Sequence, residues 1–330
     1  MNINCRSICG VVWVIVMIIS PWVLANQELA NVSLKLSPEI QTIIKGNQAN
    51  LDSVRTIQAT IESAATISFG SQGTRKLMTM EKISYDGKHL RRDTIESKFI
   101  GSETEPLLVT VPILNEKGYF RPPPSGEVQI DSNDLKIDYE PSNNTIFVRP
   151  PEWTDKRRGI LMNNMLKYQS ARGGTLKENV LWSAKNGYYF TTESEKIGGD
   201  DCILLTCNYV RPESTLKIWV VPSKGYCIKK VQDIIGQKVV DEYVATLKEY
   251  SSGIWWFDTI KAESRKHWQR VSHELTHLSA KSLTFNKTID ARVFTIADIT
   301  IPFSGARLIN EVTRTKEQPK SLCVQPGECR

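Results

Sequence analysis

The sequence predicts a mainly β protein of the α+β class, with one curved antiparallel sheet that forms an incomplete, open barrel. From residue 66 onward, extended runs with a period of two follow one another and are separated by tight turns. Helical periodicity is confined to a few short segments, the first of which begins near residue 37. We therefore expect an N-terminal amphipathic helix and one or two further helices to cover the concave face of the sheet.

The first 25 residues have the layout of a secretory signal peptide. Arg6 is the only charged side chain before an almost unbroken apolar run over residues 10–24, and Val23 and Ala25 are short residues at the −3 and −1 positions. Pro21 interrupts this run, whereas a membrane span needs ~20 uninterrupted apolar residues. We therefore favour cleavage after Ala25 and export to the periplasm over a membrane anchor.

The elements are predicted in order along the chain. Ser37 and Pro38 are typical of a helix start, and Gly46-Asn47 is expected to end that short helix. Apolar residues at spacings of three and four then predict an amphipathic helix over residues 48–65. The period changes to two afterwards, and Asp86-Gly87 between two extended runs predicts a β-hairpin.

Two further series of strands are predicted, and residues 155–169 are predicted to form a helix between them. Their consecutive order, with tight turns between neighbours, favours an antiparallel meander. The strands are expected at residues 118–121, 128–130, 135–139 and 145–148, and then at residues 187–197, 202–210, 215–221, 226–234 and 238–250.

Composition and charge are those of an ordinary globular protein, with 40% hydrophobic residues, 24% charged residues and a net charge of +6. The basic residues are scattered, so no nucleic acid is expected as a partner, whereas peripheral contact with an anionic membrane is compatible with the charge. No linker or repeat is visible. We expect residues 26–320 to form a single β-rich domain, followed by a C-terminal tail over residues 321–330.

Five cysteines follow the predicted leader, an odd number that leaves one thiol unpaired or bridged to another chain. An oxidising compartment permits two disulfides. Either Cys202 or Cys207 could bridge to Cys227, and Cys323 could pair with Cys329. The sequence leaves the pairing open.

Residues 273–277 read HELTH, a complete match to the H-E-x-x-H pattern of zinc proteases. On a helix, His273 and His277 would bind one zinc ion, and Glu274 would activate its water. The metzincin extension is absent, and no methionine follows Met165. The segment also alternates with a period of two, and in a strand the two histidines would lie ~13 Å apart. We favour a strand with no metal or cofactor, and keep a secreted zinc metalloprotease as the alternative.

Several segments resemble the Lol-type lipoprotein-sorting carriers and the related RseB-type lipoprotein sensors, a LolA/RseB-like superfamily. The likeness covers most of the mature chain in layout, and residues 101–175 are a possible insertion. It is carried by a strand–turn–strand unit, by the segments that continue it, and by a C-terminal segment: LKIWVV at 216–221, PSKGY at 222–226, residues 227–235, VVDEYVATLKEY at 239–250, GIWWF at 253–257 and FTIADITIP at 294–302.

The resemblance implies a non-catalytic carrier or sensor that holds a lipid acyl chain, or the acyl chain of a lipidated protein, in an apolar groove. Such residues can equally fill a solid core, and methionine and aromatic side chains suit both roles. A further alternative is an envelope protein-interaction module that binds partners through its sheet edges. The candidate lining residues are Leu51, Ile57, Met78, Met80, Trp219, Trp255 and Trp256.

Overall fold

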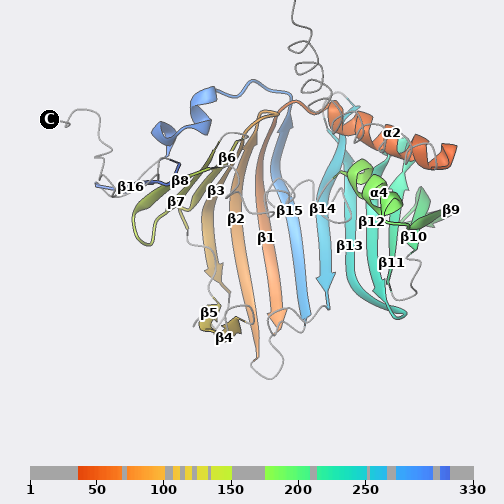
Figure 1. The fold of residues 1–330 in the computed structure, drawn as a ribbon, viewed down its shortest axis with the longest axis horizontal. Coiled ribbons are helices and arrows are strands. Elements are labelled where there is room, and N and C mark those ends of the chain that lie inside the picture. Colours follow the sequence, from red (N-terminus) through yellow and green to blue (C-terminus); the bar gives the residue numbers. More distant parts are fainter. Residues whose placement is uncertain are drawn as a thin grey trace, which may run out of the picture.

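One large curved sheet dominates the described part of the chain, and the α-helices described there, α2 and α4, pack on it (Figure 1). The sheet contains fourteen strands in the order β16-β8-β7-β6-β3-β2-β1-β15-β14-β13-β12-β11-β10-β9, and β4 and β5 form a separate two-stranded sheet. All neighbours are antiparallel except β16 and β8. The computed structural model describes residues 36–68, 73–100, 107–111, 116–120, 125–132, 135–150, 175–208, 214–250, 253–265, 273–299 and 305–312.

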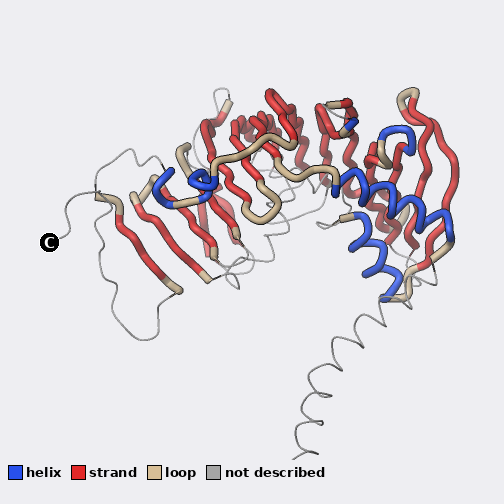
Figure 2. Tube along the Cα trace, turned by 90° about the horizontal axis from the view of Figure 1, so that it is seen from above, coloured by secondary structure: helices blue, strands red, loops and turns tan. Residues whose placement is uncertain are grey.

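The predicted fold class is confirmed, because the sheet is curved, almost wholly antiparallel and not closed. Seen from above, the strands follow an open arc, and α2 and α4 lie inside its curve near β9–β13 (Figure 2). The elements are α2 (Pro38–Asp52), β1 (Ile57–Ser68), β2 (Thr74–Tyr85), β3 (Leu90–Phe99), β4 (Leu107–Val111), β5 (Glu116–Phe120), β6 (Val128–Asp131), β7 (Lys136–Glu140), β8 (Thr145–Arg149), α4 (Leu176–Lys185), β9 (Tyr189–Ile197), β10 (Asp200–Asn208), β11 (Ser214–Val221), β12 (Cys227–Ile235), β13 (Lys238–Glu249), β14 (Trp255–Ser264), β15 (His273–Phe285) and β16 (Arg307–Asn310), with short 3-10 helices η4 (Pro222–Lys224), η6 (Ala291–Phe294) and η7 (Ile296–Asp298).

Helix α2 begins where the sequence predicts but does not end at Gly46. Ser37 is its N-cap and accepts a hydrogen bond from the Ile40 backbone N–H at 3.3 Å, and Pro38 is the first helical residue. The expected break at Gly46-Asn47 is wrong, since the helix runs on to Asp52. Gly46 serves close packing instead: a Cβ at this position would lie 2.0 Å from the ring of Tyr226.

The helix predicted over residues 48–65 is correct only for residues 48–52, which belong to α2, because Ile57–Ser68 is β1 in the middle of the sheet. Its buried residues Ile57, Ala59, Ile61, Ala65 and Ile67 alternate with less buried ones. The same apolar residues therefore fit a period of two as well as a helical period. Pairing with β2 and β15 favours the strand.

Helix α4 was not predicted, although it carries a complete capping box. The Thr175 hydroxyl accepts from the Glu178 backbone N–H, and the Glu178 carboxylate accepts from the Thr175 backbone N–H at 2.7 Å. The helix predicted at residues 155–169 lies outside the described residues. The predicted hairpin is confirmed as β2 and β3, and the meander is confirmed as β9–β13.

Opposite ends of the sheet are covered on opposite faces. Residues that pair across neighbouring strands lie on the same face of the sheet. Following these pairs from strand to strand places Ile57, Ile218 and Leu205 on one face, and α2 and α4 pack on that face at Ile218 and Leu205. Arg91 is one residue from Leu90, which shares the face of Ile57, so Arg91 points to the other face. Its ladder partner Ile130 belongs to a cluster that the segment 289–299 covers.

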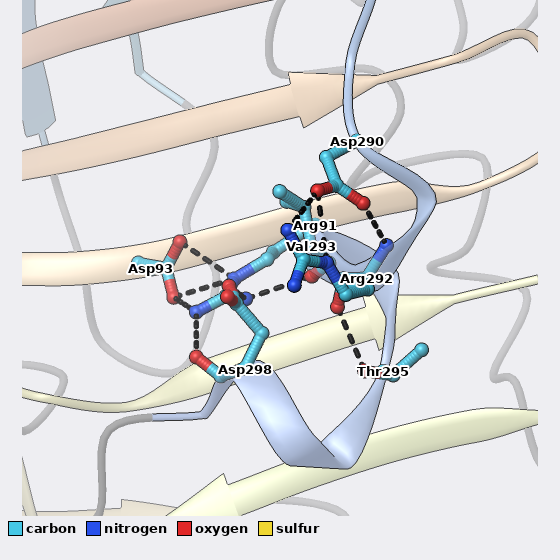
Figure 3. Close-up of polar contacts among 7 residues, drawn as sticks. All are labelled: Arg91, Asp93, Asp290, Arg292, Val293, Thr295 and Asp298. Atoms are coloured by element: carbon cyan, nitrogen blue, oxygen red, sulfur yellow. Dashed lines mark hydrogen bonds and ion pairs between the residues drawn. The ribbon is translucent and has the colours of Figure 1, made fainter.

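This covering segment, which we call the strap, is held by the buried guanidinium of Arg91 (Figure 3). Arg91 Nη1 donates to the backbone carbonyl of Val293 at 2.7 Å and to Asp298 Oδ2 at 2.5 Å, and Nε donates to Asp93. Phe294 and Ile299 of the strap are buried against β6–β8. The strap thereby extends the core to the β16 end of the sheet.

Candidate functional site

A groove of about 340 Å³ lies between α2 and α4, on the helix-covered face of the sheet. Its walls are mainly apolar, and two lysines and one aspartate lie along them. The volume is at the lower end of the range typical of small-molecule sites. The lining residues are Leu36, Gln41, Ile44, Lys45, Gln48, Ala49 and Asp52 from α2 and the residues before it, and Lys177 and Leu181 from α4.

The groove wall on α2 is fixed by two buried asparagines on the opposite side of the helix. Asn47 Nδ2 donates to the backbone carbonyl of Tyr226 at 2.9 Å, and Asn50 Nδ2 donates to that of Trp255 at 3.1 Å. Gly225 leaves room for the Asn50 side chain, because a Cβ at position 225 would lie 2.9 Å from the Asn50 side-chain oxygen. The helix is therefore attached to the β11–β12 turn and to β14 by specific hydrogen bonds as well as by apolar packing.

The apolar floor beneath the helices is a cluster that contains residues of α2, α4 and β10–β12, which we call the helix cluster. Ile43 and Leu176 are fully buried in it. The exposed sides of the two helices carry the groove: Lys45, Ala49 and Lys177 are exposed, whereas Leu181 is half-buried. A ligand in the groove would thus contact apolar side chains on one side and ammonium groups at the rim.

None of the seven lining residues predicted from the sequence is among the residues that line this groove. Ile57, Trp219 and Trp256 are buried in a second cluster, the central cluster, and Leu51 and Trp255 pack against it. Trp219 Nε1 donates to Glu195 at 2.7 Å. Met78 and Met80 are half-buried on β2 at positions that pair with Ala64 and Glu62 of β1. The structure thus brings five of the seven together and leaves the two methionines apart.

Sequence reasoning missed the groove because its residues come from two helices, one of which was not predicted. The pattern Thr175-x-x-Glu178 followed by apolar Val180 and Leu181 indicates the start of α4. Gln48, Ala49 and Asp52 could have been assigned to one helical face with Ile44 once α2 was extended through Gly46. Their proximity to α4 could not be derived from local patterns.

The HELTH segment is a strand, as the sequence analysis favours. It lies in β15, where His273 pairs with Ser68 and His277 pairs with Ala64. Residues four apart in a strand are separated by ~13 Å, so these two histidines cannot share a zinc ion. The helical geometry that the metalloprotease alternative requires is contradicted. Across the described ranges, no group of three or more histidine, cysteine or acidic side chains is placed to bind a metal.

Cys227 is a buried thiol, and the bridge considered for it is not formed. Its Sγ donates to the backbone carbonyl of Trp255 at 3.2 Å. Burial raises the pKa of the Cys227 thiol to about 12, so it stays protonated at neutral pH and is a poor nucleophile. Cys202 is also a buried thiol. Cys323 and Cys329 lie outside the described residues.

Among the described residues, no helix has the length and apolarity that crossing a membrane requires.

No protein-family model and no curated protein matches the sequence. Among solved structures, the chain is similar to an outer membrane lipoprotein-sorting protein domain from Vibrio parahaemolyticus, with 13% identity and a TM-score of 0.43 over 79% of this chain and 99% of that one. It is also similar to a LolA superfamily protein from Nitrosomonas europaea, with 11% identity and a TM-score of 0.40, and the match covers 77% of this chain and 96% of that one. A third similar structure is a DUF1329 family protein from Desulfovibrio piger, with 14% identity and a TM-score of 0.40, and the match covers 79% of this chain and 99% of that one.

The second of these structures carries the LolA superfamily name, and the first is described as a lipoprotein-sorting protein domain. Because the identities are low and the TM-scores are below 0.5, nothing about binding is transferred from these proteins to this chain.

Proposed function

We propose that the protein is a non-catalytic carrier or sensor that holds the acyl chain of a lipid or lipidated protein in the groove between α2 and α4. The observation that supports this most directly is the groove itself, with Leu36, Ile44 and Leu181 on its walls. Burial of an acyl chain contributes ~0.8 kcal/mol per CH₂, so an apolar groove suffices for binding without any catalytic group.

The polar residues of the groove favour a ligand with an anionic head. Lys45 and Lys177 line it from different helices. The single acidic lining residue, Asp52, accepts a hydrogen bond from the Gln48 side chain at 2.7 Å, which partly satisfies its carboxylate. An amphiphile with an apolar tail and an anionic head matches this distribution better than a neutral lipid does.

The central cluster is the proposed continuation of the groove for longer chains. Leu51 lies between the groove residues Gln48 and Asp52 on α2, and it packs against the central cluster with Trp255. Displacement of these side chains would admit a longer tail toward Ile57 and Trp256. Of the seven residues given a lining role from the sequence, Leu51, Ile57, Trp255 and Trp256 belong to this proposed path. Met78, Met80 and Trp219 lie on the opposite face of the sheet from Ile57, so the path does not include them.

The proposed compartment is the periplasm, after removal of residues 1–25. A carrier that takes up acyl chains must meet membranes or lipidated partners, which an exported protein does. The interaction-module alternative has less support. The edge strand β9 exposes Glu193, Glu195 and Lys196, and such charges are typical of edges protected against pairing.

Native mass spectrometry of the protein purified from an export-competent host tests this proposal. We expect a heterogeneous adduct of lipid mass on the wild-type protein. The adduct should be lost in Ala49→Trp, which fills the groove from an exposed position, and kept in Thr42→Trp, an exposed α2 residue that does not line the groove. A protein without any lipid adduct, or an adduct that Ala49→Trp leaves unchanged, would contradict the proposal.

A further inference from the structure

Two large aromatic side chains are exposed where α4 leads into β9. Trp182 is 52% exposed and Tyr189 is 56% exposed. Tyr188 lies between α4 and β9, and its ring centroid is 5.8 Å from that of Trp182. Six large hydrophobic residues are exposed in the described part of the chain, and Trp182 and Tyr189 are the aromatic ones among them. Phe190 packs against the helix cluster, so Tyr189, one residue before it on β9, points to the other face of the sheet. We call Trp182 and Tyr188 the aromatic patch.

The fold does not need Trp182 for its own core, whereas Tyr188 also packs against the helix cluster. The buried residues of α4 are Leu176, Val180 and Ser183, which lie on the side of the helix that faces the sheet, whereas Trp182 lies on the opposite side. Tryptophan and tyrosine have an apolar body and a polar end, so they are favoured where one side is hydrocarbon and the other is water.

Basic residues accompany the patch. Lys177 and Lys185 are exposed on α4. The only acidic residue of this helix, Glu178, has its carboxylate turned back onto the Thr175 backbone N–H. Along β9 the first exposed acidic residue is Glu193, four residues from Tyr189 and therefore ~13 Å away. The side of α4 that carries Trp182 is thus aromatic and basic.

We propose that the aromatic patch, with Lys177 and Lys185, docks the protein on an anionic lipid bilayer. Aromatic side chains would enter the interfacial layer while the lysines contact anionic head groups. Leu181 and Lys177 line the groove from the same helix that carries Trp182. Docking here would bring the groove to the bilayer surface, so that an acyl chain passes between the two with little exposure to water. This inference rests on the proposed function, since it names the surface from which the groove is loaded.

Flotation of the mature full-length chain with vesicles tests the inference. We expect binding to vesicles of phosphatidylethanolamine and phosphatidylglycerol, and at least fivefold weaker binding to vesicles of phosphatidylcholine alone. The double variant Trp182→Ala/Tyr188→Leu, which keeps an apolar side chain at position 188, should lose at least fivefold in binding to the anionic vesicles. Ile235→Ser, at an exposed position on a different hairpin, should bind as the wild type does.

A charge-reversal variant, Lys177→Glu/Lys185→Glu, keeps the test valid if the aromatic double variant folds poorly, and it should lose binding to the same degree. Binding that both double variants retain would overturn the inference, and so would a wild-type chain that binds no vesicles. A patch that instead mediates self-association, seen as a dimer that Trp182→Ala dissociates without any vesicle binding, would overturn it as well.

Failure of this inference is distinguishable from failure of the proposed function. A protein that carries a lipid adduct in native mass spectrometry but binds no vesicles contradicts the docking surface alone. A protein that binds anionic vesicles through the patch but carries no adduct contradicts the acyl-binding groove and supports the docking surface.

Discussion

Asn50 of α2 and Trp255 of β14 are 205 residues apart in sequence, and a hydrogen bond of 3.1 Å joins the side-chain amide of Asn50 to the backbone carbonyl of Trp255. The same amide lies 3.4 Å from Cys227 Sγ. Asn50 is buried, so this contact fixes the orientation of α2 on the sheet without solvent competition. The groove wall formed by the other side of α2 depends on it.

We expect Asn50→Ala to lower the free energy of unfolding by about 1–2 kcal/mol, because it leaves the Trp255 carbonyl with only the weak thiol donor of Cys227. Urea denaturation measures the change. The matched control is Asn143→Ala, an exposed turn residue whose amide donates to Glu140 at 2.9 Å, and it should change stability by less than about 0.5 kcal/mol. Equal effects of the two substitutions would show that Asn50 does not anchor α2.

Gly46→Ala tests whether this glycine serves close packing. Alanine is favoured over glycine in a helix by about 1 kcal/mol, yet its Cβ would lie 2.0 Å from the Tyr226 ring. We therefore expect a net destabilisation of about 1–3 kcal/mol from overpacking. In a double-mutant cycle, Tyr226→Ala should relieve most of the penalty of Gly46→Ala. A stabilising Gly46→Ala in the wild-type background would refute the close contact.

Arg91→Met tests whether the guanidinium holds the strap. The substitution removes the hydrogen bonds that Arg91 donates to Val293 and Asp298 of the strap, and it leaves Asp93 without its cation. We therefore expect the free energy of unfolding to fall by about 2–4 kcal/mol. We expect no larger loss of stability because the Asp298 side chain is 46% exposed and water screens its interaction with Arg91. Hydrogen–deuterium exchange should accelerate in residues 289–299. Arg292→Met is the control, since Arg292 is 84% exposed and contacts Asp290, and unchanged exchange in Arg91→Met would contradict the role.

Asp200 predicts a pH dependence of stability. Burial alone would raise the pKa of Asp200, but the ammonium groups of Lys224 at 2.6 Å and Lys229 at 3.1 Å outweigh it and hold the pKa below its ordinary value. A lowered pKa in the folded state stabilises the protein above the unfolded pKa of about 3.9, and this contribution is lost as the pH falls through the folded value.

Asp200→Asn should therefore destabilise the protein at pH 7 by on the order of 1 kcal/mol, and the difference from the wild type should shrink as the pH falls through the lowered pKa of Asp200 in the folded state. Thermal unfolding at pH 7 and at acidic pH measures it. The neighbouring Asp201→Asn is the matched control, because the Asp201 side chain is 90% exposed, and its small effect should not vary with pH. A pH-independent effect of Asp200→Asn would contradict the ion-pair assignment.

The sheet was predictable because its strands and turns have local sequence signals. Asp86-Gly87 marks the β2–β3 hairpin, and Gly198-Gly199 and Gly236-Gln237 mark turns of the meander, each with positive φ. The strand in the HELTH segment was likewise predictable, because its residues follow a period of two. These features depend on neighbours in sequence, so local reasoning recovers them.

The errors arose where tertiary contacts decide. Ile57, Ile61 and Ala65 fit both a helical and an extended period, and only pairing with β2 and β15 selects the strand. Gly46 resembles a helix terminator, but its lack of a side chain serves contact with Tyr226 from the other half of the chain. The groove was missed for the same reason, since it exists only where α2 meets α4.

Titration of the delipidated protein with palmitic acid, followed by calorimetry, tests the central claim most directly. The acyl-binding groove predicts saturable binding near one molecule per chain, at least tenfold weaker in Ala49→Trp and unchanged in Thr42→Trp. A tenfold change corresponds to about 1.4 kcal/mol of binding free energy. Absence of saturable binding, or equal affinity of the wild type and Ala49→Trp, would contradict the groove as the acyl-binding site.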